Sequence, residues 1–264
     1  MLLTVDIGNT NITLGFFQGD KLCFTSRLAT DRKRTHDQYA VELLNIINIY
    51  GSGTIDFCGA IISSVVPELN EVLRGAVLTV THREPLVLTS DIGSGLKIFN
   101  NITGQIGADL AAVSVGAIEK YETPCFIVDL GTANKIILID EDGTFQGLTI
   151  SAGVGISLEA LALKTSQLPA ISLKSPESSI GRTTVDCMQS GTVFGTAAMI
   201  DGLTERMEKD FGKQIKTTIA TGGLAEEIVK NCNREIIFDR NLILYGLKYI
   251  FERNTNGNDK QKKD

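Results

Sequence analysis

The chain has 264 residues, of which 43% are hydrophobic, so it can bury the cores of two lobes of ordinary domain size. Its net charge of −6 and sequence pI near 5.1 argue against non-specific binding to nucleic acid or to anionic membranes, which needs an excess of Lys and Arg. The five cysteines are dispersed without CxxC spacing, and no apolar stretch reaches the roughly 20 residues that span a bilayer, so we expect a cytoplasmic protein without a disulfide framework or zinc site.

The first half of the chain alternates strands and helices. Residues 1–27 predict three strands joined by tight turns, which form an antiparallel meander. Thr35 and Gln38 have capping-box spacing, and the apolar residues after them recur at helical intervals, which predicts a helix over residues 36–50. The other elements predicted here are a strand at 58–64, a helix that begins at Pro67, a short strand near Leu86 and a helix over 107–120. This alternation indicates an α/β fold.

The second half repeats the plan of the first. It opens with another meander, whose strands are predicted at 125–129, 136–139 and 146–150. The later elements are helices near 157–163, 185–209 and 242–251 and a strand at 217–220. We therefore expect one lobe at residues 1–118, a second at 119–252 and a solvated tail at 253–264.

One short phrase occurs twice, as VDIGNTN at residues 5–11 and as VDLGTAN at residues 128–134. In both copies a strand ends in an aspartate, a glycine frees the backbone, and small polar residues follow. A single copy is explained as well by an ordinary polar turn between strands. Two copies about one domain apart, on halves with the same order of elements, instead indicate two phosphate-binding hairpins that face a shared nucleotide cleft.

The first hairpin offers a carboxylate, hydroxyls and backbone N–H groups from Asp6, Gly8, Asn9, Thr10 and Asn11. Such groups suit a hydrated Mg²⁺ and the terminal phosphates of a nucleotide, because Mg²⁺ favours few carboxylates and several waters. A third element supports this interpretation. The strand at 217–220 runs into Thr221, Gly222 and Gly223 and then a helix, a turn that lets a flat ring such as adenine lie against the backbone.

Asp109, in the sequence GAD, is the candidate catalytic residue. An Asp in the first turn of a helix is favoured by the helix dipole alone. Phosphoryl transfer to an alcohol, however, needs a carboxylate that receives the hydroxyl proton, and the position of Asp109 between the two hairpins favours that role. Thr183 and Thr184 either hydrogen-bond a small acid or cap the long helix that follows.

The two hairpins and the TGG turn resemble those of the actin, hexokinase and Hsp70 superfamily. Within it, the chain resembles the type III pantothenate kinases, which use ATP to phosphorylate pantothenate in the first step toward coenzyme A. The motifs that carry the resemblance are DIGNTN at 6–11, RLATD at 27–31, ISSVVPEL at 62–69, GAD at 107–109, VDLGTA at 128–133, ISLEAL at 156–161, GRTTVDCMQSG at 181–191 and ATGGLA at 220–225. They run in the family's order over nearly the whole chain.

The resemblance implies a fold, an assembly and a role for each matching residue. The fold would be two duplicated ribonuclease H-like lobes, each a mixed sheet flanked by helices, around a nucleotide cleft. The assembly would be a cytoplasmic homodimer with its substrate pocket near the interface. ATP would be bound by residues 6–13, Thr13 included, and by Thr132, Gly222 and Gly223. Pantothenate would be bound by Asn100, Gly107, Ala108, Asp109, Leu110 and Thr184. Asp6 would lie near Mg²⁺, Asp129 would ligate K⁺ or NH₄⁺, and Asp109 would accept the proton.

The chain departs from the family pattern at three places. Leu110 stands where the usual GADR has an arginine, so a guanidinium expected at the substrate is absent. Asn100 stands at the tyrosine of the usual YDNP phrase, and the usual TATT reads Thr132, Ala133, Asn134, Lys135. The first two changes leave open a kinase of another small hydroxy acid, and also a catalytically weak nucleotide-binding paralogue that acts through a partner. Retention of Asp6, Asp109 and Asp129 argues against the paralogue, because clustered carboxylates without a ligand cost stability.

Lys135, six residues after Asp129, has two interpretations. Its ammonium group either takes the place of the K⁺ or NH₄⁺ ion, which would make the enzyme independent of that cation, or points to solvent from a strand edge.

Overall fold

The computed structural model describes residues 1–51, 55–89, 93–99 and 106–256. The chain forms two compact units. The first comprises Met1–Leu96, Thr103–Glu119 and Leu242–Asp264, and the second comprises Lys97–Ile102 and Lys120–Asn241.

Within the described residues, the first unit holds a five-stranded sheet with the strand order β3-β2-β1-β4-β5. The strands are β1 (Leu2–Ile7), β2 (Asn11–Gln18), β3 (Lys21–Ala29), β4 (Gly59–Ser64) and β5 (Leu86–Val87). The first three form the predicted antiparallel meander, and β4 joins parallel to β1. The carboxyl ends of β1 and β4 therefore lie side by side at one edge of the sheet, where ligands bind in open α/β sheets.

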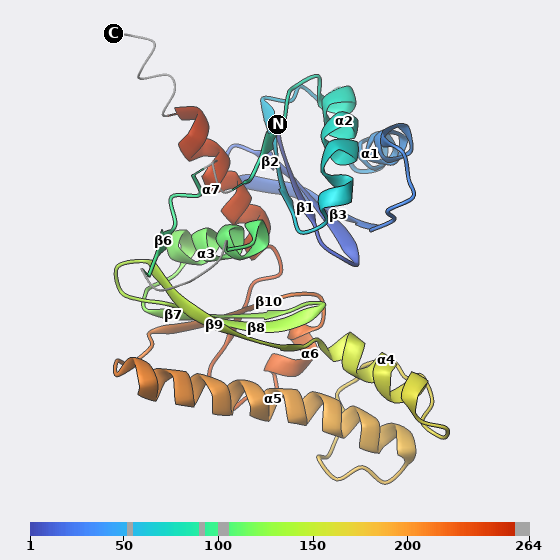
Figure 1. Ribbon diagram of the computed structural model, residues 1–264, viewed down its shortest axis with the longest axis vertical. Coiled ribbons are helices and arrows are strands. Elements are labelled where there is room, and N and C mark those ends of the chain that lie inside the picture. Colours follow the sequence, from blue (N-terminus) through green and yellow to red (C-terminus); the bar gives the residue numbers. More distant parts are fainter. Residues whose placement is uncertain (52–54, 90–92, 100–105, 257–264) are drawn as a thin grey trace. The chain divides into compact units, whose positions relative to one another are not determined.

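Helices cover both faces of this sheet (Figure 1). They are α1 (His36–Tyr50), α2 (Asn70–Thr81), α3 (Ala108–Lys120) and α7 (Leu242–Asn256). Leu3, Val5 and Ile7 pack with residues of α1 and α2, whereas Ile61 of β4 packs with residues of α3 and α7. Because side chains alternate across a strand, Asp6 lies on the face that α3 and α7 cover. The helix expected at Pro67 begins as a 3₁₀ turn, Pro67–Leu69, before α2.

The last helix belongs to a different unit from the one predicted. We expected the second lobe to run to residue 252, but α7 belongs to the first unit, where Leu244 and Leu247 are fully buried. Its Gly246 packs so closely on α3 that a methyl group there would overlap the carbonyl oxygen of Ala112. The helix also extends to Asn256, so residues 253–256 of the predicted tail are helical. Residues 257–264 lie outside the described part of the chain.

The described part of the second unit contains a six-stranded sheet with the order β11-β10-β7-β8-β9-β6. The strands are β6 (Lys97–Ile98), β7 (Cys125–Leu130), β8 (Ala133–Ile139), β9 (Thr144–Ala152), β10 (Thr217–Thr221) and β11 (Ile237–Phe238). The order β9-β8-β7-β10-β11 repeats β3-β2-β1-β4-β5, with the same antiparallel meander and the same parallel neighbours. The predicted duplication of an α/β plan is confirmed.

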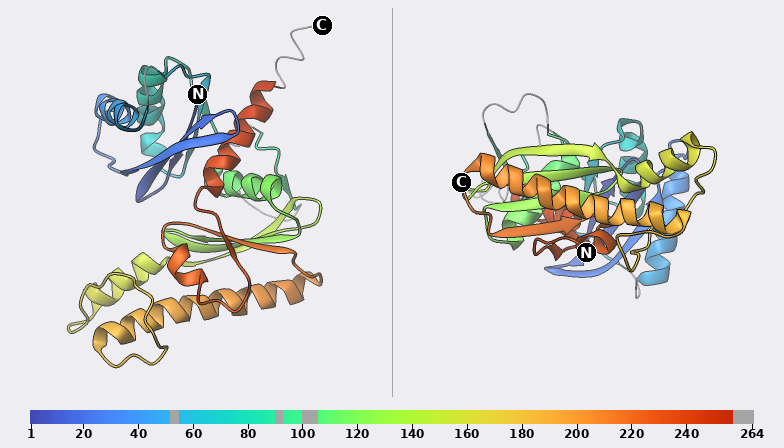
Figure 2. Two further views of the ribbon diagram at one scale, coloured as in Figure 1. Left: turned by 180° about the vertical axis from the view of Figure 1, so that it is seen from behind. Right: turned by 90° about the horizontal axis from the view of Figure 1, so that it is seen from below.

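The helices of the second unit are α4 (Val154–Lys164), α5 (Thr184–Phe211) and α6 (Ala225–Val229). Figure 2 shows α5, in orange, along one face of the sheet, where Val193, Ala197 and Ile200 are buried. Thr183 caps α5 in a reciprocal capping box with Asp186, so the capping interpretation of Thr183 is confirmed. In the described ranges, no helix combines the length and apolar character that crossing a bilayer requires.

Candidate active site

The first hairpin ends β1 with a carboxylate between two hydroxyl-bearing neighbours. Asp6 is the register partner of Thr13 on β2 and of Ser63 on β4. Register partners on neighbouring strands point to the same face of a sheet, so the three side chains form one row. The turn beyond this row is closed by the Gly8 N–H, which donates to the Asn11 carbonyl at 3.0 Å.

Sequence reasoning missed Ser63. This residue is fully buried, and its Oγ has no hydrogen-bond partner among the residues that the structure describes. A buried polar group without a partner costs free energy, and functional sites are a common reason for one. The available signal was the position of Ser63 near the end of the strand predicted at 58–64.

The second hairpin repeats this row with different chemistry. Asp129 on β7 is the register partner of Lys135 on β8 and of Thr221 on β10. Lys135 Nζ donates to Asp129 Oδ2 at 3.1 Å, and the two side chains are only 18% and 21% exposed. Lys135 thus points along the row toward Asp129, and the solvent-facing interpretation of Lys135 is wrong.

The turn after β10 lies against the second hairpin. Gly222 has a φ of +104°, a conformation that side-chain-bearing residues rarely adopt, and a methyl group on it would overlap the backbone of Leu130. On the other side of the hairpin, Gly153 donates its N–H to the carbonyl of Thr132 at 3.2 Å. Within the second unit the fold therefore brings Asp129, Thr132 and the Gly222-Gly223 pair together.

Asp109 lies in the first turn of α3, directly after Gly107 and Ala108. Its Oδ1 accepts the Leu110 N–H at 2.8 Å, and the residue is half-buried. Because α3 packs on the sheet face that carries Asp6, both carboxylates belong to one unit and one face of its sheet. Asn100, the remaining predicted substrate residue, lies outside the described residues.

Thr184 lies on a cavity of about 850 Å³ within the second unit. The cavity is lined largely by apolar side chains of α4 and α5, with Arg182, Thr183 and Thr184 among its polar groups. Asn134 also lines it. The Nδ2 of this buried residue donates to the Ala152 carbonyl at 3.0 Å, while its Oδ1 has no partner in the described structure. An apolar cavity with one cation and an unpaired acceptor suits a small amphipathic acid.

Among the described residues, no group of three or more His, Cys, Asp or Glu side chains forms a metal cage.

Comparison with known proteins decides the family. A family model described as type III pantothenate kinase matches residues 2–206. The type III pantothenate kinase of Finegoldia magna is 41% identical over 258 residues, which are 97% of this chain and 98% of that protein. The chain belongs to the type III pantothenate kinase family. The enzyme of the same name from Brevibacillus brevis is 37% identical over 254 residues, covering 96% of this chain and 99% of its own.

Solved structures show the fold that this family member shares. A Campylobacter jejuni protein assigned to the Baf family of transcriptional activators has a TM-score of 0.61 at 20% identity, with 96% of this chain and 99% of that chain covered. Component A of the (R)-2-hydroxyglutaryl-CoA dehydratase of Acidaminococcus fermentans has a TM-score of 0.54 at 14% identity, with 93% and 94% covered. These likenesses show that the chains share a fold.

Proposed function

We propose that this chain transfers the γ-phosphoryl group of ATP to the primary hydroxyl of pantothenate, the first step of coenzyme A biosynthesis. The observation that carries the proposal is the match to pantothenate kinases over 96% of the chain and 99–100% of several relatives, together with two hairpins that each end a strand in an aspartate. These relatives do not favour a kinase of another small hydroxy acid or a catalytically weak nucleotide-binding paralogue that acts through a partner.

We propose that each hairpin contacts phosphate groups of ATP. The row of Asp6, Thr13 and Ser63 fits Mg²⁺, because a hard cation prefers oxygen ligands and all three side chains offer only oxygen. Asp6, Thr13 and Ser63 would hold the ion there, and it would supply positive charge that offsets the negative charge developing on the transferred phosphoryl group. Gly8, Asn9, Thr10 and Asn11 would contact phosphate from the first hairpin. Thr132 would do so from the second, and Gly222 and Gly223 would lie against the adenine.

Asp109 is our candidate for the proton acceptor. Its carboxylate would take the proton of the pantothenate hydroxyl as that oxygen attacks the γ-phosphorus. Gly107, Ala108, Leu110 and Asn100 would line the acceptor end. Leu110 supplies no guanidinium, and we propose that Thr184 and its neighbour Arg182 on the cavity of the second unit contact the polar ends of pantothenate instead.

Lys135 would replace the monovalent cation. An ammonium group 3.1 Å from Asp129 already supplies one positive charge at that carboxylate. The second hairpin would then need neither K⁺ nor NH₄⁺, although the resemblance of the chain to its family implies such an ion at Asp129.

We propose a homodimer on the basis of exposed apolar side chains in the second unit. Large apolar residues that are exposed in the described part of the second unit include Ile150, Ile156, Leu161, Leu163, Ile180 and Val185. Large exposed apolar side chains are common at interfaces between protein chains, and we propose that a second copy of this chain covers these residues. All five cysteines lie in the described ranges and are free thiols. We propose a cytoplasmic location.

Release of ADP, measured over a panel of small hydroxy acids, tests the function. Release with pantothenate supports it, and release only with another acid would move the chain to a different acceptor. Protection of the fold by nucleotide without any turnover would point to the paralogue.

A further inference from the structure

The loop between β3 and α1, residues 30–35, is fastened to the first hairpin at its start. The Thr30 N–H donates to the Thr10 carbonyl at 3.0 Å, and Thr30 Oγ1 donates to the Gly8 carbonyl at 2.7 Å. Two bonds from one residue to both sides of the hairpin turn hold the loop in a fixed place beside the proposed phosphate site.

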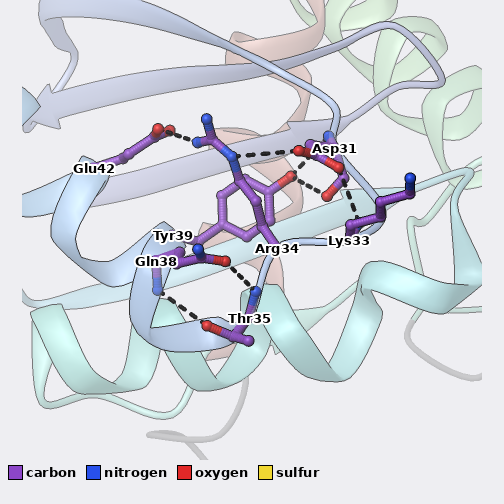
Figure 3. Close-up of polar contacts among 7 residues, drawn as sticks. All are labelled: Asp31, Lys33, Arg34, Thr35, Gln38, Tyr39 and Glu42. Carbon is purple, nitrogen blue, oxygen red and sulfur yellow. Dashed lines mark hydrogen bonds and ion pairs between the residues drawn. The ribbon is translucent and has the colours of Figure 1, made fainter.

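A fully buried tyrosine of α1, Tyr39, also holds the loop through hydrogen bonds to Asp31 (Figure 3). Tyr39 Oη accepts the Asp31 N–H at 3.0 Å and donates to the Asp31 carbonyl at 2.9 Å. The Arg34 guanidinium lies 5.8 Å from the centre of the Tyr39 ring and pairs with Asp31 at 3.7 Å and with Glu42. These contacts hold the backbone of Asp31, immediately before residue 32, and the side chain of Arg34, two residues after it.

Arg32 is the exposed residue held between these fixed points. Its Nη2 donates to Asn9 Oδ1, at the tip of the hairpin, at 3.2 Å. The hairpin itself, residues 6–13, contains one aspartate and neither lysine nor arginine. A triphosphate bound there needs positive charge from elsewhere, and within the first unit the Arg32 guanidinium contacts the hairpin tip.

We infer that Arg32 contacts a terminal phosphate of the nucleotide and sets the preference of the first hairpin for triphosphate over monophosphate. This inference rests on the proposed function, which places phosphates at that hairpin. A guanidinium has five donors, and its bond to Asn9 uses one of them. A phosphate oxygen is a stronger acceptor than the Asn9 amide because both partners of the bond are then charged. Asn9 holds the guanidinium at the hairpin, and the Tyr39 contacts hold the loop that carries it.

The test is direct binding of ATP, ADP and AMP, each with Mg²⁺, to the full-length protein and its Arg32→Gln and Arg32→Lys variants. Gln keeps a side-chain N–H donor but carries no charge. We expect Arg32→Gln to weaken ATP binding about tenfold, which is the loss of one charge-assisted hydrogen bond, and to leave AMP binding nearly unchanged. Arg32→Lys should recover part of the loss. Lys33→Gln is the matched control, because Figure 3 shows its side chain directed away from the Tyr39 contacts, and it should bind all three nucleotides normally.

A second variant separates contact from positioning. Tyr39→Phe removes both hydrogen bonds to Asp31, so it should also reduce the preference for ATP over AMP, and it should add little in an Arg32→Gln background. Equal weakening of ATP, ADP and AMP by Arg32→Gln, or no weakening, would overturn the inference. A different result would separate the two proposals. If ATP binding depends on Arg32 as expected but the wild type does not phosphorylate pantothenate, the proposed function is wrong and the role of Arg32 stands.

Discussion

The ammonium group of Lys135 lies 3.1 Å from the carboxylate of Asp129, its register partner across the second hairpin. At the matching place in the first unit, the register partner of Asp6 is Thr13. The two hairpins therefore share a backbone plan and differ by one positive charge. This difference supports the proposal that the first hairpin engages a metal ion, whereas the Asp129 carboxylate of the second already has a counter-charge from Lys135.

Removing that charge should create a cation requirement. Wild-type turnover in Tris buffer should change little when K⁺ is added. Lys135→Thr should lose turnover without K⁺ and regain part of it with K⁺, because Asp129 would lack its internal partner. Its unfolding free energy should fall by about 1–3 kcal/mol, the usual cost of leaving a partly buried polar group unpaired. The control is Lys216→Thr, which replaces an exposed lysine of the same unit and should create no cation requirement. Strong stimulation of the wild type by K⁺ would refute the replacement.

Asp109→Asn should separate binding from chemistry. The amide cannot accept the hydroxyl proton, so kcat should fall by about 10²- to 10⁴-fold while ATP still binds. Glu119→Gln, at the opposite end of α3, where Glu119 pairs with Arg253, should keep kcat. An Asp109→Asn variant with normal turnover would remove Asp109 from its proposed role.

Gly222 and Gly202 should respond oppositely to alanine. Gly222→Ala forces a methyl group into the Leu130 backbone at a φ of +104°, so both nucleotide affinity and thermal stability should drop. Gly202 lies within α5 and faces open space where a methyl group would stand, so Gly202→Ala should raise stability by about 0.5–1 kcal/mol through helix propensity. Calorimetry of both variants checks the pair. Tolerance of Gly222→Ala would show that the TGG turn can relax.

Glu208 should govern part of the acid stability of the second unit. Burial alone would raise the pKa of Glu208, but the Ile215 N–H and Arg234 outweigh it and lower that pKa below 4.5. As the pH falls, Glu208 therefore takes up a proton in the unfolded state before it does so in the folded state. The contribution of Glu208 to the unfolding free energy is complete above about pH 4.5 and is lost as the pH falls through the folded-state pKa. Glu208→Gln should flatten the fall of unfolding free energy below that pH, and Glu205→Gln on the exposed side of α5 should not. The same fall of unfolding free energy below pH 4.5 in the wild type and in Glu208→Gln would contradict this role of Glu208.

Much of the fold follows from local patterns in the sequence. The repeated VDIGNTN and VDLGTAN phrases predict the two hairpins because a glycine turn between alternating strands fixes register locally. Thr35 and Gln38 predict the start of α1, since both partners of a capping box lie within one turn.

Features set by long-range packing were not predictable in the same way. The two-residue strands β6 and β11 have too few residues to show periodicity, and only pairing with β9 and β10 defines them. The placement of α7 in the first unit depends on the close contact of Gly246 with α3, which no local pattern announces. Lys135 stayed ambiguous because spacing from Asp129 gives the register but not the direction of a long side chain.

The central claim is phosphorylation of pantothenate at its primary hydroxyl, and ³¹P NMR of a reaction with ATP, Mg²⁺ and pantothenate tests it most directly. A phosphomonoester on a CH₂ group gives a phosphorus signal split by the two attached protons. We expect that split signal to grow as the signals of ADP appear, and to be absent with Asp109→Asn. Formation of inorganic phosphate alone, or no consumption of ATP at all, would contradict the proposal.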